Sequence, residues 1–190
     1  MPRGFVERLR AVEFGALSRR YFVSNGFDGA LTCVGLVVGA FLSGVTDGVT
    51  VVRVGAGAAV GLATSGVWSV WEIERAEKRA ELEQLEAAML ADLEGTGPDH
   101  RRRRERVVNA VASGAGPVLG VLVPLVPFLL EGPVLTMTEA TLVAVATAVA
   151  ILFGFGAFLS RESDQWWVVA GLRMGAAGLF VALLTLVLPG

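Results

Sequence analysis

The acidic residue with the clearest potential for chemistry is Asp28, which stands at the start of a long apolar run in the string Ser24-Asn25-Gly26-Phe27-Asp28-Gly29. If that helix begins near Tyr21, Asp28 lies about 10 Å along it. An ionised side chain at the centre of a membrane costs on the order of 2.5–3.5 kcal/mol by insertion scales. A carboxylate kept there suggests a metal ligand or a proton carrier. The alternative is that the helix begins at Gly29 and Asp28 is its N-cap at the membrane interface.

A second group of carboxylates follows in residues 72–94, which contain no Gly or Pro before Gly95. On a helix, Glu74, Glu77 and Glu81 fall within about 60° of one another. Carboxylates suit divalent cations such as Mn²⁺ and Fe²⁺, so this face is a candidate cation site, duplicated by a partner subunit. A charge run is more often a solvated face with ion pairs, and this alternative stays open.

Residues 72–94 also carry an apolar stripe. It is typical of a packing seam, although Met89 is also a candidate soft ligand. The stripe consists of Leu82, Leu85, Met89 and Leu93.

Composition narrows the class of protein. Hydrophobic residues make up 54% of the chain, glycine adds 24 residues, and the mean hydropathy is +0.63. These values exclude a disordered chain and disfavour a soluble domain. A net charge of −2 disfavours nucleic acid as a partner. One Cys33 and one His100 cannot form a disulfide, a Cys/His zinc site or a catalytic triad, so we expect neither an enzyme nor a cofactor.

The elements that must position these residues are five hydrophobic runs, each close to the roughly 20 residues that a membrane-spanning helix needs. We therefore predict an all-α membrane protein with five transmembrane helices, in which the second helix continues into the cytoplasm. A continuous helix over 72–94 would project about 35 Å. The runs cover roughly 28–46, 54–71, 107–130, 140–160 and 167–190.

Lysine and arginine positions predict the orientation, because cytoplasmic loops are rich in both. Residues 1–27 hold five of them, 47–53 hold one, 72–106 hold eight, and 131–139 hold none, while Arg161 lies in the last connection. This pattern predicts a cytoplasmic N-terminus and an outer C-terminus.

The predicted domain organisation has two parts. Residues 1–22 are expected to form an interfacial amphipathic helix. Residues 23–190 would form the membrane domain, with a cytoplasmic helical insertion at 72–106.

Glycines and polar side chains within the runs are more typical of packing than of a pathway. Pairs of glycines four residues apart let helices approach closely, inside one protomer in preference to a dimer seam. Hydroxyl groups at this depth can bond their own backbone, and Glu139 is expected to cap the fourth helix. The glycine pairs are Gly35/Gly39, Gly57/Gly61, Gly116/Gly120 and Gly171/Gly175, and the other polar residues are Thr32, Thr64, Ser65, Asn109 and Ser113.

The order of these parts resembles the vacuolar iron transporter family. Residues 25–29 are similar to its Asp-Gly signature, and the second run leads directly into a Glu-rich helix, as in that family. Residues 120–128 match its Gly…Pro-Leu-x-Pro-Phe pattern, and 171–175 fit its closing helix. The chain departs from the family late in the second run, where Ala63 and residues 66–68 (Gly-Val-Trp) replace a common Met and Gly-Glu-Tyr.

The resemblance implies a homodimer in the cell membrane with its pathway at the subunit interface. It would move Fe²⁺ or Mn²⁺ as substrate out of the cytoplasm, in exchange for protons. Asp28 would be the pathway carboxylate, and the cytoplasmic metal-binding segment would include Glu74, Glu77, Glu81 and Glu86. The alternative function is a non-transporting membrane scaffold or regulatory protein that binds a partner through the helix 72–94.

Overall fold

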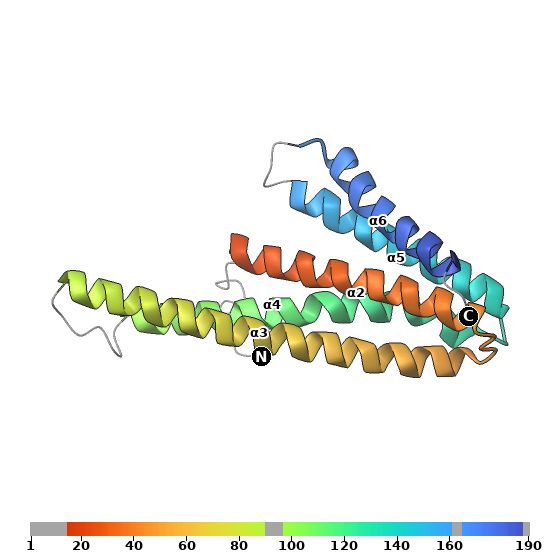
Figure 1. Ribbon diagram of the computed structural model, residues 1–190, viewed down its shortest axis with the longest axis horizontal. Helices are drawn as coiled ribbons and strands as arrows, with labels where there is room; N and C mark the ends of the chain where they lie inside the picture. Colours follow the sequence, from red (N-terminus) through yellow and green to blue (C-terminus); the bar gives the residue numbers. More distant parts are fainter. Residues whose placement is uncertain (1–14, 90–96, 161–164, 188–190) are drawn as a thin grey trace, which may run out of the picture.

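The computed structural model describes residues 15–89, 97–160 and 165–187, and in these ranges the chain is built from α-helices with one short 3-10 helix. The five long helices are each long and apolar enough to cross a membrane. The predicted class is therefore confirmed: this is an all-α, multi-pass integral membrane protein (Figure 1). The elements are α2 (Ala16–Leu42), α3 (Gly48–Met89), α4 (Gly97–Leu125), η1 (Val126–Leu130), α5 (Met137–Leu159) and α6 (Trp167–Val187).

The first span begins earlier than the sequence pattern indicates. Helix α2 starts at Ala16, so Asp28 lies twelve residues inside it and cannot be an N-cap at Gly29. The part of the expected interfacial helix that the structure describes, from Ala16 onward, is the beginning of α2 itself. The rest of that expected helix lies outside the described residues.

Helices α2 and α4 cross in close backbone contact, which glycines make possible. A Cβ placed at Gly116 would lie 2.3 Å from the backbone oxygen of Phe22, and one at Gly120 would lie 2.5 Å from that of Gly26. A Cβ at Gly29 would lie 2.7 Å from the Cα of Pro117. Small residues at this spacing let two backbones pack directly on each other.

Three of the four predicted glycine pairs pack inside the protomer. Gly35 and Gly39 face α6, Gly116 and Gly120 face α2, and Gly171 and Gly175 face α5. The pair Gly57/Gly61 differs, because nothing lies within 4 Å of a Cβ at either position.

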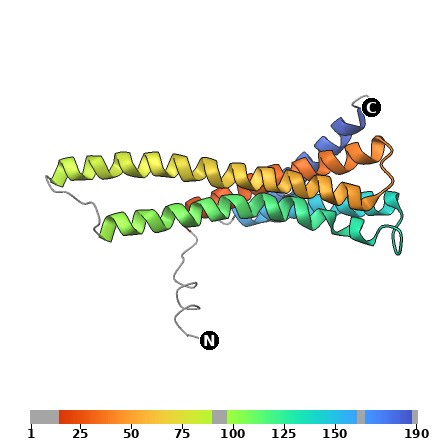
Figure 2. The same cartoon turned by 90° about the horizontal axis from the view of Figure 1, so that it is seen from below.

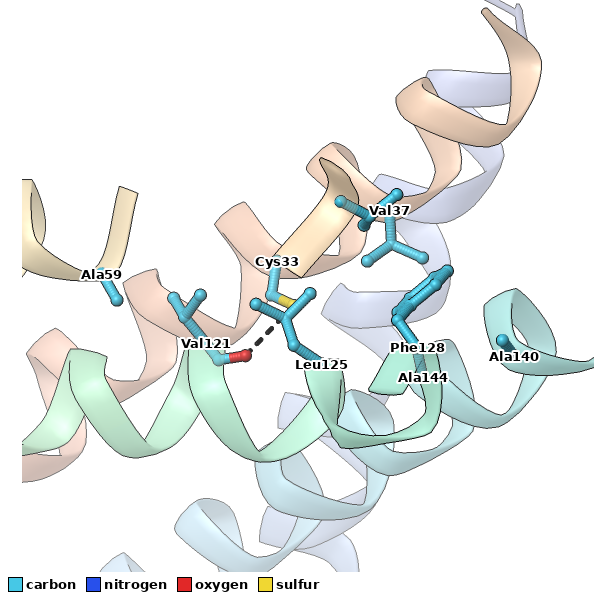
Figure 3. Close-up of a cluster of buried hydrophobic side chains, with 9 residues drawn as sticks. Cys33, Val37, Ala59, Val121, Leu125, Phe128, Ala140 and Ala144 are labelled. Carbon is cyan, nitrogen blue, oxygen red and sulfur yellow. Dashed lines mark hydrogen bonds between the residues drawn. The ribbon is translucent and has the colours of Figure 1, made fainter. Parts of the chain in front are cut away.

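The apolar core gathers near the end of the bundle where α4 turns into η1. Phe128 and Leu125 are almost fully buried there, between α2, α3 and α5. Figure 3 shows these side chains around Cys33, whose thiol donates to the backbone oxygen of Val121 at 3.5 Å. The cluster fixes the ends of four helices relative to one another, because core side chains are closely packed.

Both connections at this end are capped by side chains. Before α3, the hydroxyl of Thr50 and the backbone N–H groups of Thr50 and Val49 donate to Asp47, which lowers the pKa of that exposed carboxyl. Before α5, Thr136 and Glu139 form a reciprocal capping box. The predicted capping role of Glu139 is therefore confirmed.

Helix α3 runs unbroken for 42 residues, about 63 Å, which is twice the hydrocarbon thickness of a typical bilayer. Its second half lies beside the first turns of α4, and together they form a two-helix arm beyond the other helices (Figures 1 and 2). The predicted continuation of the second span into a helix is confirmed as far as Met89.

Candidate functional site

Asp28 lies on the outer surface of the bundle. Its side chain is exposed, as are those of Ser24 and Thr32, one turn before and one turn after it on α2. Within the described part of the chain, no hydrogen bond or ion pair reaches the carboxylate. The protomer thus presents a row of three polar side chains within a candidate membrane span.

The glycines beside Asp28 explain this direction. Gly26 and Gly29 are both buried against α4. At about 100° per residue, Asp28 points roughly 200° away from Gly26 and must face away from α4. Residues 26–29 therefore supply the packing contact on one side of α2 and the carboxylate on the other.

A second polar cluster is buried where α3 leaves the bundle. Glu74 is 1% exposed, and its Oε1 accepts hydrogen bonds from Asn109 Nδ2 at 3.0 Å and from the Tyr21 hydroxyl at 3.4 Å. Ser18, which is also buried, donates its hydroxyl to Asn109 Oδ1. We call these four residues the Glu74 cluster. It joins α2, α3 and α4 through side chains alone.

Two contacts border the cluster. Asn25 Nδ2 donates to Ser113 Oγ at 2.9 Å, which links α2 to α4 a second time. The guanidinium of Arg106 lies 4.4 Å from the ring centre of Trp71, a cation–π contact between α4 and α3. The Nε atom of Arg106 is buried and has no hydrogen-bond partner in the described structure.

The remaining predicted ligands are placed differently from Glu74. Glu77 and Glu81 are exposed on the arm, and Glu86 is half-buried. The position of Met89 ends α3, but its side chain lies outside the described part of the structure. In the described residues of this single chain, no three His, Cys, Asp or Glu side chains come together as a metal site. Asp28 and the glutamates are thus at separate places on the protomer.

The positions where the chain departs from the family pattern line a groove between α3 and α4. Its volume is about 760 Å³, and Ala63 and Val67 form part of its wall together with Thr64 and Trp68. Its other walls are apolar or glycine positions of α4, between Val111 and Val123. Where a soft ligand and an acid would stand, this chain therefore has a largely apolar surface.

Sequence reasoning missed part of the Glu74 cluster. Asn109 and Ser113 were expected to be neutral packing residues that bond their own helix, but both bond side chains of other helices. The sequence pattern assigned no role to Tyr21 or Ser18. Only the arrangement in space brings residues 91 and 53 positions apart into contact. The sole signal in the sequence was that each is a polar residue in or beside an apolar run.

The fold defines a multi-pass α-helical membrane protein, with an exposed carboxylate on a spanning helix and further exposed carboxylates on an extended arm. Comparison with known families agrees: the model of the VIT family matches residues 68–189, more than half of the chain. The chain belongs to the VIT family, the vacuolar iron transporter family that its sequence resembles. Membership suggests membrane transport of metal ions.

A curated relative extends the similarity to nearly the whole chain. An uncharacterized protein of Methanocaldococcus jannaschii is 28% identical over 187 residues, covering 97% of this chain and 94% of the relative. The similarity therefore includes α2 and the first part of α3, which precede the matched family region.

Proposed function

We propose that this protein is a homodimeric transporter that moves Fe²⁺ or Mn²⁺ out of the cytoplasm in exchange for protons. Its N-terminus and its two-helix arm would lie in the cytoplasm, in keeping with the arginine-rich segments 1–27 and 72–106. The exposed glutamates of the arm, such as Glu77 and Glu81, would gather the cation, and Asp28 would bind it within the membrane.

The observation that carries the proposal is the position of Asp28. It lies in the middle of a spanning helix, is exposed on the protomer, and has polar neighbours one turn away on either side. An ionised carboxylate is costly to leave against lipid, so this row of side chains requires a polar covering. A second copy of the chain would supply it, and would place two Asp28 carboxylates beside one path.

Carboxylate and hydroxyl oxygens are suitable ligands for Mn²⁺ and Fe²⁺. In the proposed cycle, ionised Asp28 binds the cation and releases it when it takes up a proton from the outer side. The proton then leaves toward the cytoplasm, which couples the two flows in opposite directions.

The test is a flux assay in proteoliposomes loaded with a metal-sensitive dye, with Mn²⁺ and Fe²⁺ supplied to the arm side. We expect Asp28→Asn to lower the initial rate at least about tenfold, because even the outer partners of metal ligands cost 10–100-fold when removed. The matched control is Asp47→Asn, which changes an exposed carboxyl outside the spans to an amide whose oxygen can still accept a hydrogen bond from the backbone N–H of Thr50. It should leave the rate unchanged.

Two results would overturn the proposal: no metal flux above that of empty vesicles, or an equal rate for Asp28→Asn and the unsubstituted protein. Flux without simultaneous proton movement, followed by a pH-sensitive dye in the same vesicles, would reject the coupling alone.

A further inference from the structure

Glu74 differs from every other glutamate on the described part of the arm because its side chain is buried. A carboxylate in the protein interior is costly unless hydrogen bonds satisfy it. Here the bonds come from two other helices, Tyr21 on α2 and Asn109 on α4. The buried side chain of Glu74 therefore links three helices, α2, α3 and α4, at one point.

That point is where α3 changes its surroundings. Among the described side chains of α3, Glu74 is the last that is buried, and after it α3 carries exposed Glu77 and Glu81 on the arm. The cation–π contact of Arg106 with Trp71 lies one turn earlier on the same helix. The direction in which the arm leaves the bundle is thus set by contacts within one turn of α3.

The cluster also reaches the helix that carries Asp28. Tyr21 precedes Asp28 by seven residues, about 10.5 Å along α2, and lies within about 20° of it around the helix. A movement of Glu74 would be transmitted through Tyr21 to the row of polar side chains on α2.

We propose that Glu74 is a positioning residue and not a metal ligand: the Glu74 cluster holds the acidic arm in a fixed direction relative to the helix that carries Asp28. This inference rests on the proposed transport function. Glu74 is buried and its Oε1 already accepts bonds from Asn109 and Tyr21, whereas Glu77 and Glu81 are exposed to solvent.

The first test compares two neutral substitutions one turn apart, Glu74→Gln and Glu77→Gln, in the Mn²⁺ flux assay. Glutamine keeps an oxygen that can accept the bonds from Asn109 and Tyr21, so Glu74→Gln should leave KM and the maximal rate within about twofold. Glu77→Gln removes a negative charge that attracts the cation to the arm, and it should raise KM for Mn²⁺ at least about threefold. Glu74→Ala, which removes the acceptor, should impair transport, and Glu74→Gln should restore it.

The second test measures geometry and does not depend on transport. Spin labels at Ala80→Cys on the arm and Ala146→Cys on α5, both exposed positions, report their separation by pulsed electron resonance in a Cys33→Ala background. Labelled protein is mixed with excess unlabelled protein so that each assembly carries one labelled chain. We expect a single narrow distance distribution in the unsubstituted protein and in Glu74→Gln, and a broadened one in Glu74→Ala and in Asn109→Ala.

The outcomes separate the two proposals. If no variant transports metal but the distances behave as expected, the transport function fails and the positioning role stands. If Glu74→Gln and Glu74→Ala weaken transport equally, with KM raised and distances unchanged, Glu74 is a ligand and the inference is wrong. Asn109→Ala serves where Glu74→Ala does not fold, and an unbroadened distribution for it would also overturn the inference.

Discussion

At the scale of single residues, neighbours on α2 have opposite roles. Gly29 has no side chain and lets α4 approach to contact distance, while Asp28 faces the outside of the bundle. Each role depends on the other, because the backbone contact at the glycines fixes how α2 is rotated. A carboxylate one position away in sequence would then face a different neighbour.

This close approach predicts a large difference between two glycine substitutions. Gly116→Ala would place a Cβ 2.3 Å from the Phe22 oxygen, and overpacking of this kind typically costs about 1–3 kcal/mol. Gly57→Ala adds a methyl group where nothing lies within 4 Å, and alanine is favoured over glycine in a helix by about 1 kcal/mol.

The measurement is the midpoint of thermal unfolding of the purified protein in detergent. We expect Gly116→Ala to lower it by several degrees and Gly57→Ala to leave it unchanged or raise it. Equal midpoints for the two variants would contradict the described crossing of α2 and α4.

At the scale of elements, α3 combines two functions in one helix. Its apolar first half spans the membrane, and its acidic second half forms the arm with α4 (Figure 2). A continuous helix transmits direction over its whole length, since each residue is hydrogen-bonded to the next turn. The location of the glutamates is therefore set by how the span packs.

Breaking α3 at the turn that holds Glu74 should separate these functions. Ala76→Pro removes one helical hydrogen bond and forces a clash with the preceding turn, at a cost of about 3 kcal/mol or more. Because Ala76 is exposed and lies outside the apolar part of α3, the bundle should still fold. Ala76→Ser is the control that keeps the helix.

We expect Ala76→Pro to keep the elution volume of the unsubstituted protein in gel filtration while its Mn²⁺ flux at low metal concentration falls. The maximal rate at saturating Mn²⁺ should change less. Unaltered flux at low Mn²⁺ would show that the direction of the arm is irrelevant to metal capture.

At the scale of the whole molecule, one surface of the protomer carries polar side chains along a spanning helix. The row Ser24, Asp28 and Thr32 is polar and exposed on a spanning helix, while α5 and α6 show lipid-compatible apolar side chains such as Leu142 and Leu183. A homodimer that covers the α2 row would keep the Asp28 carboxylate away from lipid, where an ionised side chain is costly.

Cross-linking tests this arrangement. In a Cys33→Ala background, Thr32→Cys should form a covalent dimer in membranes when treated with a short thiol cross-linker. Ala146→Cys, which is exposed on α5 at a similar depth, about ten residues from the same end of the bundle, should not. Cross-linking of Ala146→Cys alone would place the interface elsewhere.

The sequence alone determined the class of this protein and the number of its spans, because runs of about 20 apolar residues have few stable arrangements other than membrane helices. It also predicted the continuation of the second span and the cap at Glu139, since both depend on residues close together in the chain. Asp28 could also be identified from the sequence, because it is a charged residue within an apolar run.

Only the tertiary structure decided which way these side chains face. That Asp28 lies on the outer surface, and that Glu74 is buried while Glu77 is exposed, follows from the rotation and packing of whole helices. Ser18, Tyr21 and Asn109 join Glu74 across more than 30 positions of sequence. No local pattern encodes such contacts, because each joins side chains of two different helices.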